Sequence, residues 1–499
     1  MHDIGNPPFG HFGEESIRNW FKNNLCKLQF EGKTLDEHLN EQMKNDLYHF
    51  EGNAQALRLL TKLHYLVDEN GMHLTYALLN TLIKYPVSSC EIDKNSGNIK
   101  DKKMGYFFAE KELFEEITKS TSAVDCRYPL TYLLEAADDI AYCTADIEDA
   151  VKKGFLTYHE LVKELKSTEY VNRLLDEEER KCYVKYVSML EDKYNKAKER
   201  KIVNPELNAV QNWVIAVQGF LLSCASFGFT KNYRDIITGN FKHEVLQSSH
   251  GAVLSNALKD ISYRLVFRSK EILKTEITAG NIINYLLDAF VPAVINYEKG
   301  SKLPPMEDRL MSLISDNYLQ IYEIHSKDKS KEEKLYLRLL LATDFMCGMT
   351  DSYAKQLYQE LSGIEGGGNY MLISEYLEEI YFQFKNEVAT LSNLCELKEV
   401  NYLSDHIPDY TNRAVQLFYC LKYHFGYACE YELMYKNVLK ELKDKDAISV
   451  LSIGCGNGID LWALQKSLER TKTNVKINYY GVDKIEWCNK VKGRDNDNV

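Results

Sequence analysis

Apolar residues recur every three or four positions along the first three quarters of the chain. Leu57, Leu60, Leu63 and Leu66 form one such series, and residues 133–141 contain another. This spacing places the apolar side chains on one face of an α-helix. Strand patterns are sparse in this region, and only nine prolines are present in the whole chain to interrupt helices. The pattern predicts a mainly α fold.

The pattern changes toward the C-terminus. Residues 366–368 are three glycines, which are unfavourable inside any regular element and predict a linker. After a further helical stretch, residues 448–453 form the first convincing strand, and a glycine loop follows at once. We therefore expect a helical domain at residues 1–365, a linker and helical connector at 366–400, and a small, incomplete α/β Rossmann-like segment at 401–499.

Composition describes a globular protein that can bury a sizeable core. The 499 residues favour two or three domains, and 45% of them are hydrophobic. A net charge of -12 argues against a general nucleic-acid coat, although local basic patches for phosphates fit with it. The twelve cysteines form no CxxC pair, and no signal-peptide pattern is present, so we expect a cytoplasmic protein. The apolar stretch 213–229 contains polar interruptions and is interpreted as a buried helix, with no membrane association.

Two chemically informative pairs lie in the first fourteen residues. His2 and Asp3 are adjacent, and imidazole nitrogen with carboxylate oxygen suits Mn, Fe, Mg or Zn. His11 and Glu14 are three positions apart, so a helix places them on one face, where Glu14 can orient the imidazole for proton transfer. A simpler interpretation makes Glu14 a first-turn carboxylate favoured by the helix dipole and His11 a capping or packing residue.

A second informative segment covers residues 132–150. Asp138, Tyr142 and Asp146 are four positions apart, so two carboxylates and a phenol project along one helical stripe. Buried carboxylates in such an arrangement need a cation or hydrogen-bond donors. A solvated acidic face would give the same pattern.

Three motifs together carry a family resemblance. HDIGNPPFGHFGE at residues 2–14, FEGNAQ at 50–55 and EAADDIAY at 135–142 resemble the signature of bacterial dGTP triphosphohydrolases, a branch of the HD-domain phosphohydrolase superfamily. The resemblance covers residues 1–364 and implies the HD-domain helical phosphohydrolase fold. It implies metal-dependent hydrolysis of dGTP, with other dNTPs as further candidates, to deoxynucleoside and inorganic triphosphate. Such enzymes normally carry a long segment before the first motif, with another histidine ligand, so the resemblance also implies an N-terminally truncated chain.

The resemblance assigns roles to individual residues. His2, Asp3 and Asp138 would hold Mg or Mn, and His11 and Glu14 would work beside the metal in catalysis. LIKY at residues 82–85 and KKMGY at 102–106 match two lysine segments of the family, and a triphosphate needs such cations. The implied substrate contacts are Asn53, Lys84, Tyr85, Lys103, Tyr142 and Asp146. The resemblance further implies a homo-oligomer, commonly a hexamer, with nucleic acid as an effector at most.

The C-terminal glycine loop carries a second, weaker resemblance. A strand, a GxGxG loop, a helix and a strand that ends in an acid form a nucleotide-binding half-unit. This looks like a class I S-adenosylmethionine-dependent methyltransferase, although Ser452 stands where many relatives carry an acid. A glycine-rich unit used only for packing would look similar. The implied cofactor-binding residues are Gly454, Gly456, Gly458 and Asp483.

Three functions therefore remain open. The first is a metal-dependent dNTP triphosphohydrolase that acts on dGTP. The second is a catalytically impaired nucleotide-binding or regulatory protein, which turnover with metal would distinguish from the first. The third is a methyltransferase fragment with an accessory HD domain, which S-adenosylmethionine binding would support.

Overall fold

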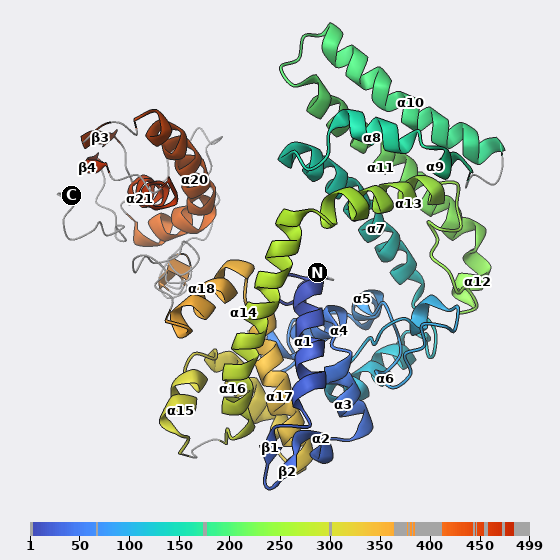
Figure 1. Ribbon diagram of the computed structural model, residues 1–499. Coiled ribbons are helices and arrows are strands. Elements are labelled where there is room, and N and C mark those ends of the chain that lie inside the picture. Colours follow the sequence, from blue (N-terminus) through green and yellow to red (C-terminus); the bar gives the residue numbers. More distant parts are fainter. Residues whose placement is uncertain are drawn as a thin grey trace. The chain divides into compact units, whose positions relative to one another are not determined.

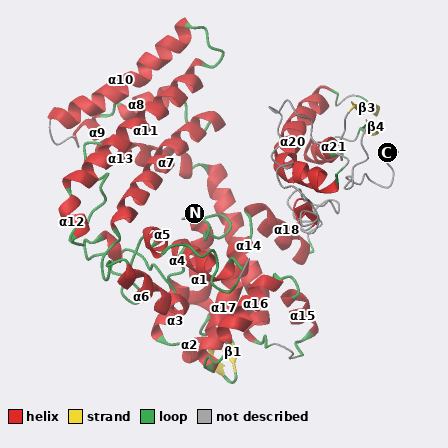
Figure 2. Cartoon of the chain, turned by 180° about the vertical axis from the view of Figure 1, so that it is seen from behind, coloured by secondary structure: helices red, strands yellow, loops and turns green. Residues whose placement is uncertain are grey.

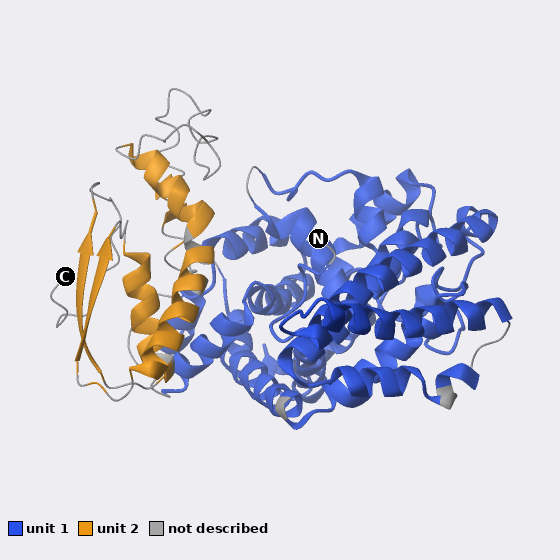
Figure 3. Cartoon of the chain, turned by 90° about the horizontal axis from the view of Figure 1, so that it is seen from above, with its two compact units in different colours: residues 1–364 blue, residues 365–499 orange. Residues whose placement is uncertain are grey.

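The computed structural model describes residues 3–65, 68–172, 177–298, 302–363, 412–442, 447–453, 458–471 and 475–483, together with Lys445 and a few residues between 377 and 384. Helices make up most of the described chain (Figures 1 and 2). The chain divides into two compact units, Met1–Ile364 and Glu365–Val499 (Figure 3). The predicted mainly α fold is confirmed. The glycine triplet at 366–368 and most of the expected connector at 366–400 lie outside the described residues.

One hydrophobic core of the first unit gathers around helices from both ends of that unit. Residues 335–347 of one of these helices are buried without interruption, as expected for a helix that is surrounded on all sides. The elements around this core are α1 (His11–Asn24), β1 (Gln29–Phe30), β2 (Lys33–Thr34), α2 (Leu35–His38), α3 (Glu41–Tyr48), α4 (Gly52–Arg58), α14 (Lys270–Ile295), α15 (Pro305–Met311), α16 (Asp316–Ser326), α17 (Lys331–Cys347) and α18 (Asp351–Leu361).

A second core lies among the middle helices of the first unit. Its elements are α7 (Pro129–Lys153), α8 (Tyr158–Leu165), α9 (Thr168–Asn172), α10 (Glu177–Glu199), α11 (Pro205–Lys231), α12 (Tyr233–Ile237), α13 (Ala252–Ile261) and the π-helix η4 (Ser262–Phe267). Helix α7 begins with Pro129 in its first turn and ends at Gly154, whose φ of 78° gives a left-handed cap. Local sequence therefore sets both ends of the helix that carries the 132–150 segment.

A smaller hydrophobic cluster is formed by residues that lie, along the chain, between segments of the two larger cores. It includes the π-helix η1 (Leu59–Leu63), α5 (Tyr76–Leu82) and α6 (Lys111–Ser120), with the short 3-10 helices η2 (Ile99–Asp101) and η3 (Phe108–Glu110) nearby in the chain. The loops after α5 and η2 carry Lys84 and Lys103.

Two described helices, α11 and Ile272–Ile295 within α14, are long and apolar enough to cross a membrane by length and composition alone. Both contribute fully buried side chains to the hydrophobic cores, including Trp213 in α11 and Phe290 in α14. The expectation of a buried helix at 213–229 needs one correction, because Leu222 and Phe227 are exposed. Helix α11 packs one face on α7 and α10 and turns the other face outward.

The second unit contains a small parallel βαβ unit. Strand β3 (Ala447–Ile453) pairs in parallel with β4 (Lys476–Val482), and α21 (Ile459–Thr471) connects them in sequence. Helix α21 packs along α20 (Arg413–Glu441). The expected strand at 448–453 lies within β3, and the α/β character of this segment agrees with the sequence analysis.

Candidate functional site

The loop that precedes α1 lies directly against the first turn of α4. A Cβ added to Gly5 would lie 2.2 Å from the Ala56 nitrogen, and one added to Gly52 would lie 2.2 Å from Asn6 Oδ1. Only glycine permits so close an approach of the two backbones. Asn6 also donates from its backbone and side chain to Asp3, at 3.2 and 3.3 Å. The two glycines therefore bring the Asp3 turn next to the FEGNAQ segment.

A residue from the end of the first unit holds the same loop. Phe9 has a φ of 65°, which is uncommon for a residue other than glycine. Its backbone N–H donates to Asp351 Oδ1 at 2.8 Å, at the start of α18. Asp351 stands 342 positions away, so no local pattern identifies it.

His11 and Glu14 meet at the start of α1, as their spacing predicts. His11 Nδ1 lies 3.0 Å from Glu14 Oε2, and the Gly52 N–H donates to Glu14 Oε1 at 2.7 Å. The hydrogen bond to Glu14 raises the pKa of His11. Burial opposes ionisation of Glu14, but hydrogen bonds from His11 and Gly52 outweigh it and lower the pKa of Glu14. A buried carboxylate thus orients an imidazole that is largely exposed.

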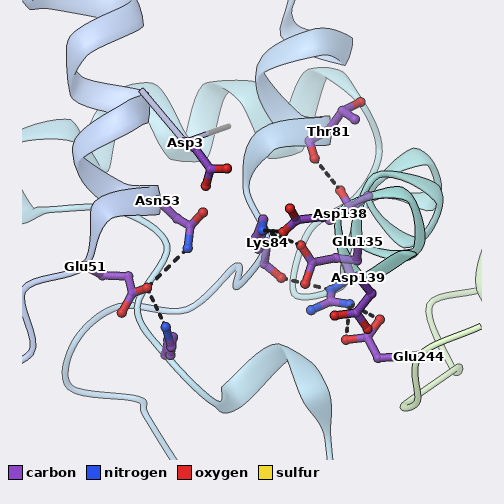
Figure 4. Close-up of polar contacts among 12 residues, drawn as sticks. Asp3, Glu51, Asn53, Thr81, Lys84, Glu135, Asp138, Asp139 and Glu244 are labelled. Carbon is purple, nitrogen blue, oxygen red and sulfur yellow. Dashed lines mark hydrogen bonds and ion pairs between the residues drawn. The ribbon is translucent and has the colours of Figure 1, made fainter. Parts of the chain in front are cut away.

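Glu51 is a candidate site residue that the sequence patterns did not single out, although it lies inside the FEGNAQ motif. Its Oε1 accepts from Lys103 Nζ at 2.7 Å and from Asn53 Nδ2 at 3.2 Å (Figure 4). Arg18 Nη1 lies 3.7 Å from both Glu51 and Glu14. Burial, followed by the charge of Glu14, raises the pKa of Glu51. We call these residues, with His11, the Glu51 cluster.

The second lysine has carboxylate partners on α7. Lys84 Nζ lies 2.7 Å from Glu135 Oε1 and 2.8 Å from Asp138 Oδ2 (Figure 4). These carboxylates raise the pKa of Lys84 although burial opposes the shift, and burial raises the pKa of Glu135. Arg127 Nε donates to the Lys84 carbonyl at 2.9 Å, and Arg127 Nη1 bonds both oxygens of Glu244 at 3.1 Å. We call this group the Lys84 cluster.

Tyr85 links the two clusters. Burial raises the pKa of Tyr85, and both Glu135 and Glu51 add to that effect. The Arg127 guanidinium lies 5.7 Å from the Tyr85 ring, and a Cβ added to Gly105 would lie 1.8 Å from the Tyr85 carbonyl. Tyr85, in the first lysine segment, therefore packs its backbone directly against Gly105 of the second lysine segment.

The stripe on α7 includes Tyr142, whose pKa is influenced by a carboxylate of the N-terminal loop. Burial, followed by the charges of Asp146, Asp138 and Asp3, raises the pKa of Tyr142. The influence of Asp3 indicates that the N-terminal loop approaches this face of α7, and Figure 4 shows Asp3 with Asp138 in one view. Burial raises the pKa of Asp146 to about 6. Three carboxylates from two distant segments therefore influence the phenol of Tyr142.

The donor chemistry of this face fits a hard divalent cation. Asp3 and Asp138 supply carboxylate oxygens, the ligands that Mg and Mn prefer. His2, the third predicted ligand, lies outside the described residues. Among the residues that the structure describes, no group of three His, Cys, Asp or Glu side chains is arranged around a common metal position. Metal binding therefore stays a prediction.

The C-terminal candidate site is described only in part. Gly458 has a φ of 88°, which favours glycine, and it directly precedes α21. Asp483 follows the last residue of β4. Gly454 and Gly456 lie outside the described residues. The hydroxyl of Tyr479 bonds both oxygens of buried Asp460 at 2.8 Å and ties β4 to α21.

Comparison with known proteins finds several curated relatives. A deoxyguanosinetriphosphate triphosphohydrolase-like protein of Listeria monocytogenes is 47% identical over 367 residues, which cover 73% of this chain and 76% of that protein. A deoxyguanosinetriphosphate triphosphohydrolase of Serratia proteamaculans is 31% identical over 409 residues, which cover 73% of this chain and 77% of that protein. A deoxyguanosinetriphosphate triphosphohydrolase-like protein of Pseudomonas aeruginosa is 31% identical over 371 residues, with 72% and 75% covered. No family model matches the chain.

Proposed function

Because the chain belongs to the deoxyguanosinetriphosphate triphosphohydrolase family, we propose that it hydrolyses dGTP to deoxyguanosine and inorganic triphosphate. One observation carries the proposal at the level of residues. Lys103 is oriented by buried Glu51 at 2.7 Å, and Lys84 is oriented by Glu135 and Asp138 at 2.7 and 2.8 Å. The partly exposed ammonium of Lys103 suits a substrate with several negative charges, and the partly exposed carboxylate of Asp138, which Lys84 supports from below, suits a metal ion. Other dNTPs are further candidate substrates.

The His11–Glu14 pair supplies proton transfer in this proposal. The His11 side chain is 72% exposed, so its imidazole reaches the solvent side of the site. Glu14 is buried and fixed by the Gly52 N–H, so it orients the imidazole and favours its charged form. His11 can then exchange a proton with the attacking water or with the leaving oxygen.

We further propose that the reaction requires Mg or Mn, held by His2, Asp3 and Asp138. Such an ion supplies Lewis-acid chemistry, because it polarises a phosphate oxygen and neutralises negative charge. Lys103 and Asn53 would contact the phosphates, and Tyr85 would pack beside them. Tyr142 and Asp146, farther along the α7 stripe, would contact the deoxyribose.

The direct test uses the full chain with dGTP and either Mn or Mg. We expect chromatography to show deoxyguanosine and inorganic triphosphate in equal amounts. Asp138→Asn should abolish the reaction. Asp139→Asn is the matched control, because Asp139 is the next residue on α7 and pairs instead with Lys259 at 2.8 Å. Formation of dGMP and pyrophosphate, or no product with either metal, would contradict the proposal.

The C-terminal unit supports a second, separate candidate function. We propose that its parallel β3–α21–β4 unit binds an S-adenosylmethionine-like cofactor, because Gly458 and Asp483 stand at the glycine loop and at the end of β4. Isothermal titration of the full chain with S-adenosylmethionine tests this. Asp483→Asn should weaken binding by about tenfold through loss of hydrogen bonds to the ribose, whereas Glu430→Gln on α20 should leave it unchanged.

Assembly and location are predictions that accompany the proposed function. A homo-oligomer, hexameric as the resemblance implies, would appear directly as the mass of the purified chain in light scattering. A cytoplasmic location fits the dNTP substrate, and fractionation of cells that express the full chain would check it.

A further inference from the structure

Glu51 is buried at the point where three segments of the site meet. Its side chain is 3% exposed, and its polar neighbours come from α1, α4 and the loop after η2. A buried carboxylate is costly unless several donors satisfy it. Lys103 supplies the closest contact, at 2.7 Å, and Arg18 lies farther away, at 3.7 Å.

We propose that Glu51 is a positioning residue that holds Lys103 and Asn53 toward the substrate. When the triphosphate binds, the Lys103 ammonium exchanges its contact with Glu51 for a contact with phosphate. The inference rests on the proposed function, which supplies the triphosphate. The Lys103 side chain is 36% exposed, so its ammonium lies between a buried carboxylate and the open side of the site. An ammonium has three donors and can turn from one oxygen to another without movement of the backbone.

The surroundings of Glu51 give this exchange a measurable consequence. Arg18 Nη1 also donates to the Phe50 carbonyl at 2.9 Å, which holds the guanidinium at equal distance from Glu51 and Glu14. Once Lys103 contacts phosphate, the two buried carboxylates share one guanidinium, so a proton from solvent becomes favourable at Glu51. The charged or titratable groups that face Glu51 are Lys103, Arg18, Glu14, His11 and Tyr85.

Binding of inorganic triphosphate to the full chain with Mg tests the exchange without need of turnover. Titration calorimetry near pH 6.5, in two buffers of different ionisation enthalpy, counts the protons taken up. We expect Glu51→Gln to remove part of the wild-type uptake and to bind triphosphate about tenfold more tightly, because Lys103 no longer has a competing carboxylate. We also expect its kcat for dGTP to fall, since Lys103 and Asn53 lose their orientation. Equal affinity and equal proton uptake in both proteins would overturn the proposal.

A double-mutant cycle separates positioning from a general structural role. If Glu51 acts through Lys103, then Glu51→Gln combined with Lys103→Met should bind triphosphate like Lys103→Met alone. Additive effects would contradict the proposal, as would a failure of the wild type to bind triphosphate. Lys102→Met is the matched control and should bind like the wild type. Binding with the Glu51-dependent uptake, but without dGTP hydrolysis, would refute the proposed function and leave this inference standing.

Discussion

The Glu51 cluster and the Lys84 cluster both pair lysine with carboxylates, but the carboxylate is the buried partner in the first and the lysine is the buried partner in the second. In the first, the Glu51 side chain is 3% exposed and its partner Lys103 is 36% exposed. In the second, the Lys84 side chain is 8% exposed and its partner Asp138 is 32% exposed. One cluster therefore turns positive charge outward, and the other turns negative charge outward.

This difference indicates which ligand each cluster suits. An outward ammonium that rests on a buried carboxylate suits phosphate oxygens, whereas an outward carboxylate that rests on a buried ammonium suits a cation. Lys103 and Asp138 are therefore better placed to meet ligands than Glu51 and Lys84.

Removal of the buried carboxylate beside His11 should have the largest effect. Glu14→Ala leaves the Gly52 N–H and Arg18 without their shared partner, and His11 without its orienting group. We expect dGTP turnover to fall at least about 100-fold and the free energy of unfolding to fall by about 2 kcal/mol. Steady-state kinetics and urea denaturation measure both. Glu15→Ala, an exposed carboxylate on the same helix, should behave like the wild type.

Lys84→Met should cost mainly stability. The change leaves the partly buried Glu135 and Asp138 without their common cation, so the free energy of unfolding should fall by about 2 kcal/mol. Thermal and urea denaturation check this. An unchanged stability with only a raised KM would show that Lys84 faces substrate directly and that the two clusters are alike.

Lys103→Met should act mainly on substrate affinity. Because this lysine is more exposed, and because Asn53 and Arg18 still face Glu51 when it is lost, we expect a rise in the KM for dGTP of about tenfold and a smaller loss of stability than for Lys84→Met. Steady-state kinetics over a range of dGTP concentrations gives the KM. If Lys84→Met and Lys103→Met both destabilise the chain equally, the contrast in depth has no functional meaning.

Asp146→Asn should reveal a cost of ionisation on the α7 stripe. The pKa of Asp146 is about 6 against an ordinary value of 3.8, so the folded state binds its proton more tightly than the unfolded state does. The stability that this group contributes is complete below its unfolded pKa and is lost as pH rises through about 6. Because the side chain is half-buried, we expect Asp146→Asn to be about 1 kcal/mol more stable than the wild type at pH 8. The advantage should shrink on approach to pH 4. Urea denaturation of both proteins across this pH range measures it, and a difference in stability that does not change with pH would contradict the prediction.

Patterns within one helix were predictable from the sequence. The three-residue spacing of His11 and Glu14 predicted a contact that the structure shows at 3.0 Å, and the four-residue spacing of Asp138 and Tyr142 predicted their common stripe. Helical periodicity likewise predicted the mainly α fold. Helix geometry relates only near neighbours, so this information is present in any short segment.

Contacts between distant segments depend on how the elements of the folded chain pack. The Phe9 N–H donates to Asp351, Arg127 donates to Glu244, and Lys103 donates to Glu51. These bonds form only when segments far apart in the chain pack together. Local sequence patterns therefore account for the helices, the family resemblance and the residue types of the site. The burial of each charged side chain depends on which elements cover it. No periodic pattern in the sequence predicts that Glu51 and Lys84 are the buried members of their ion pairs.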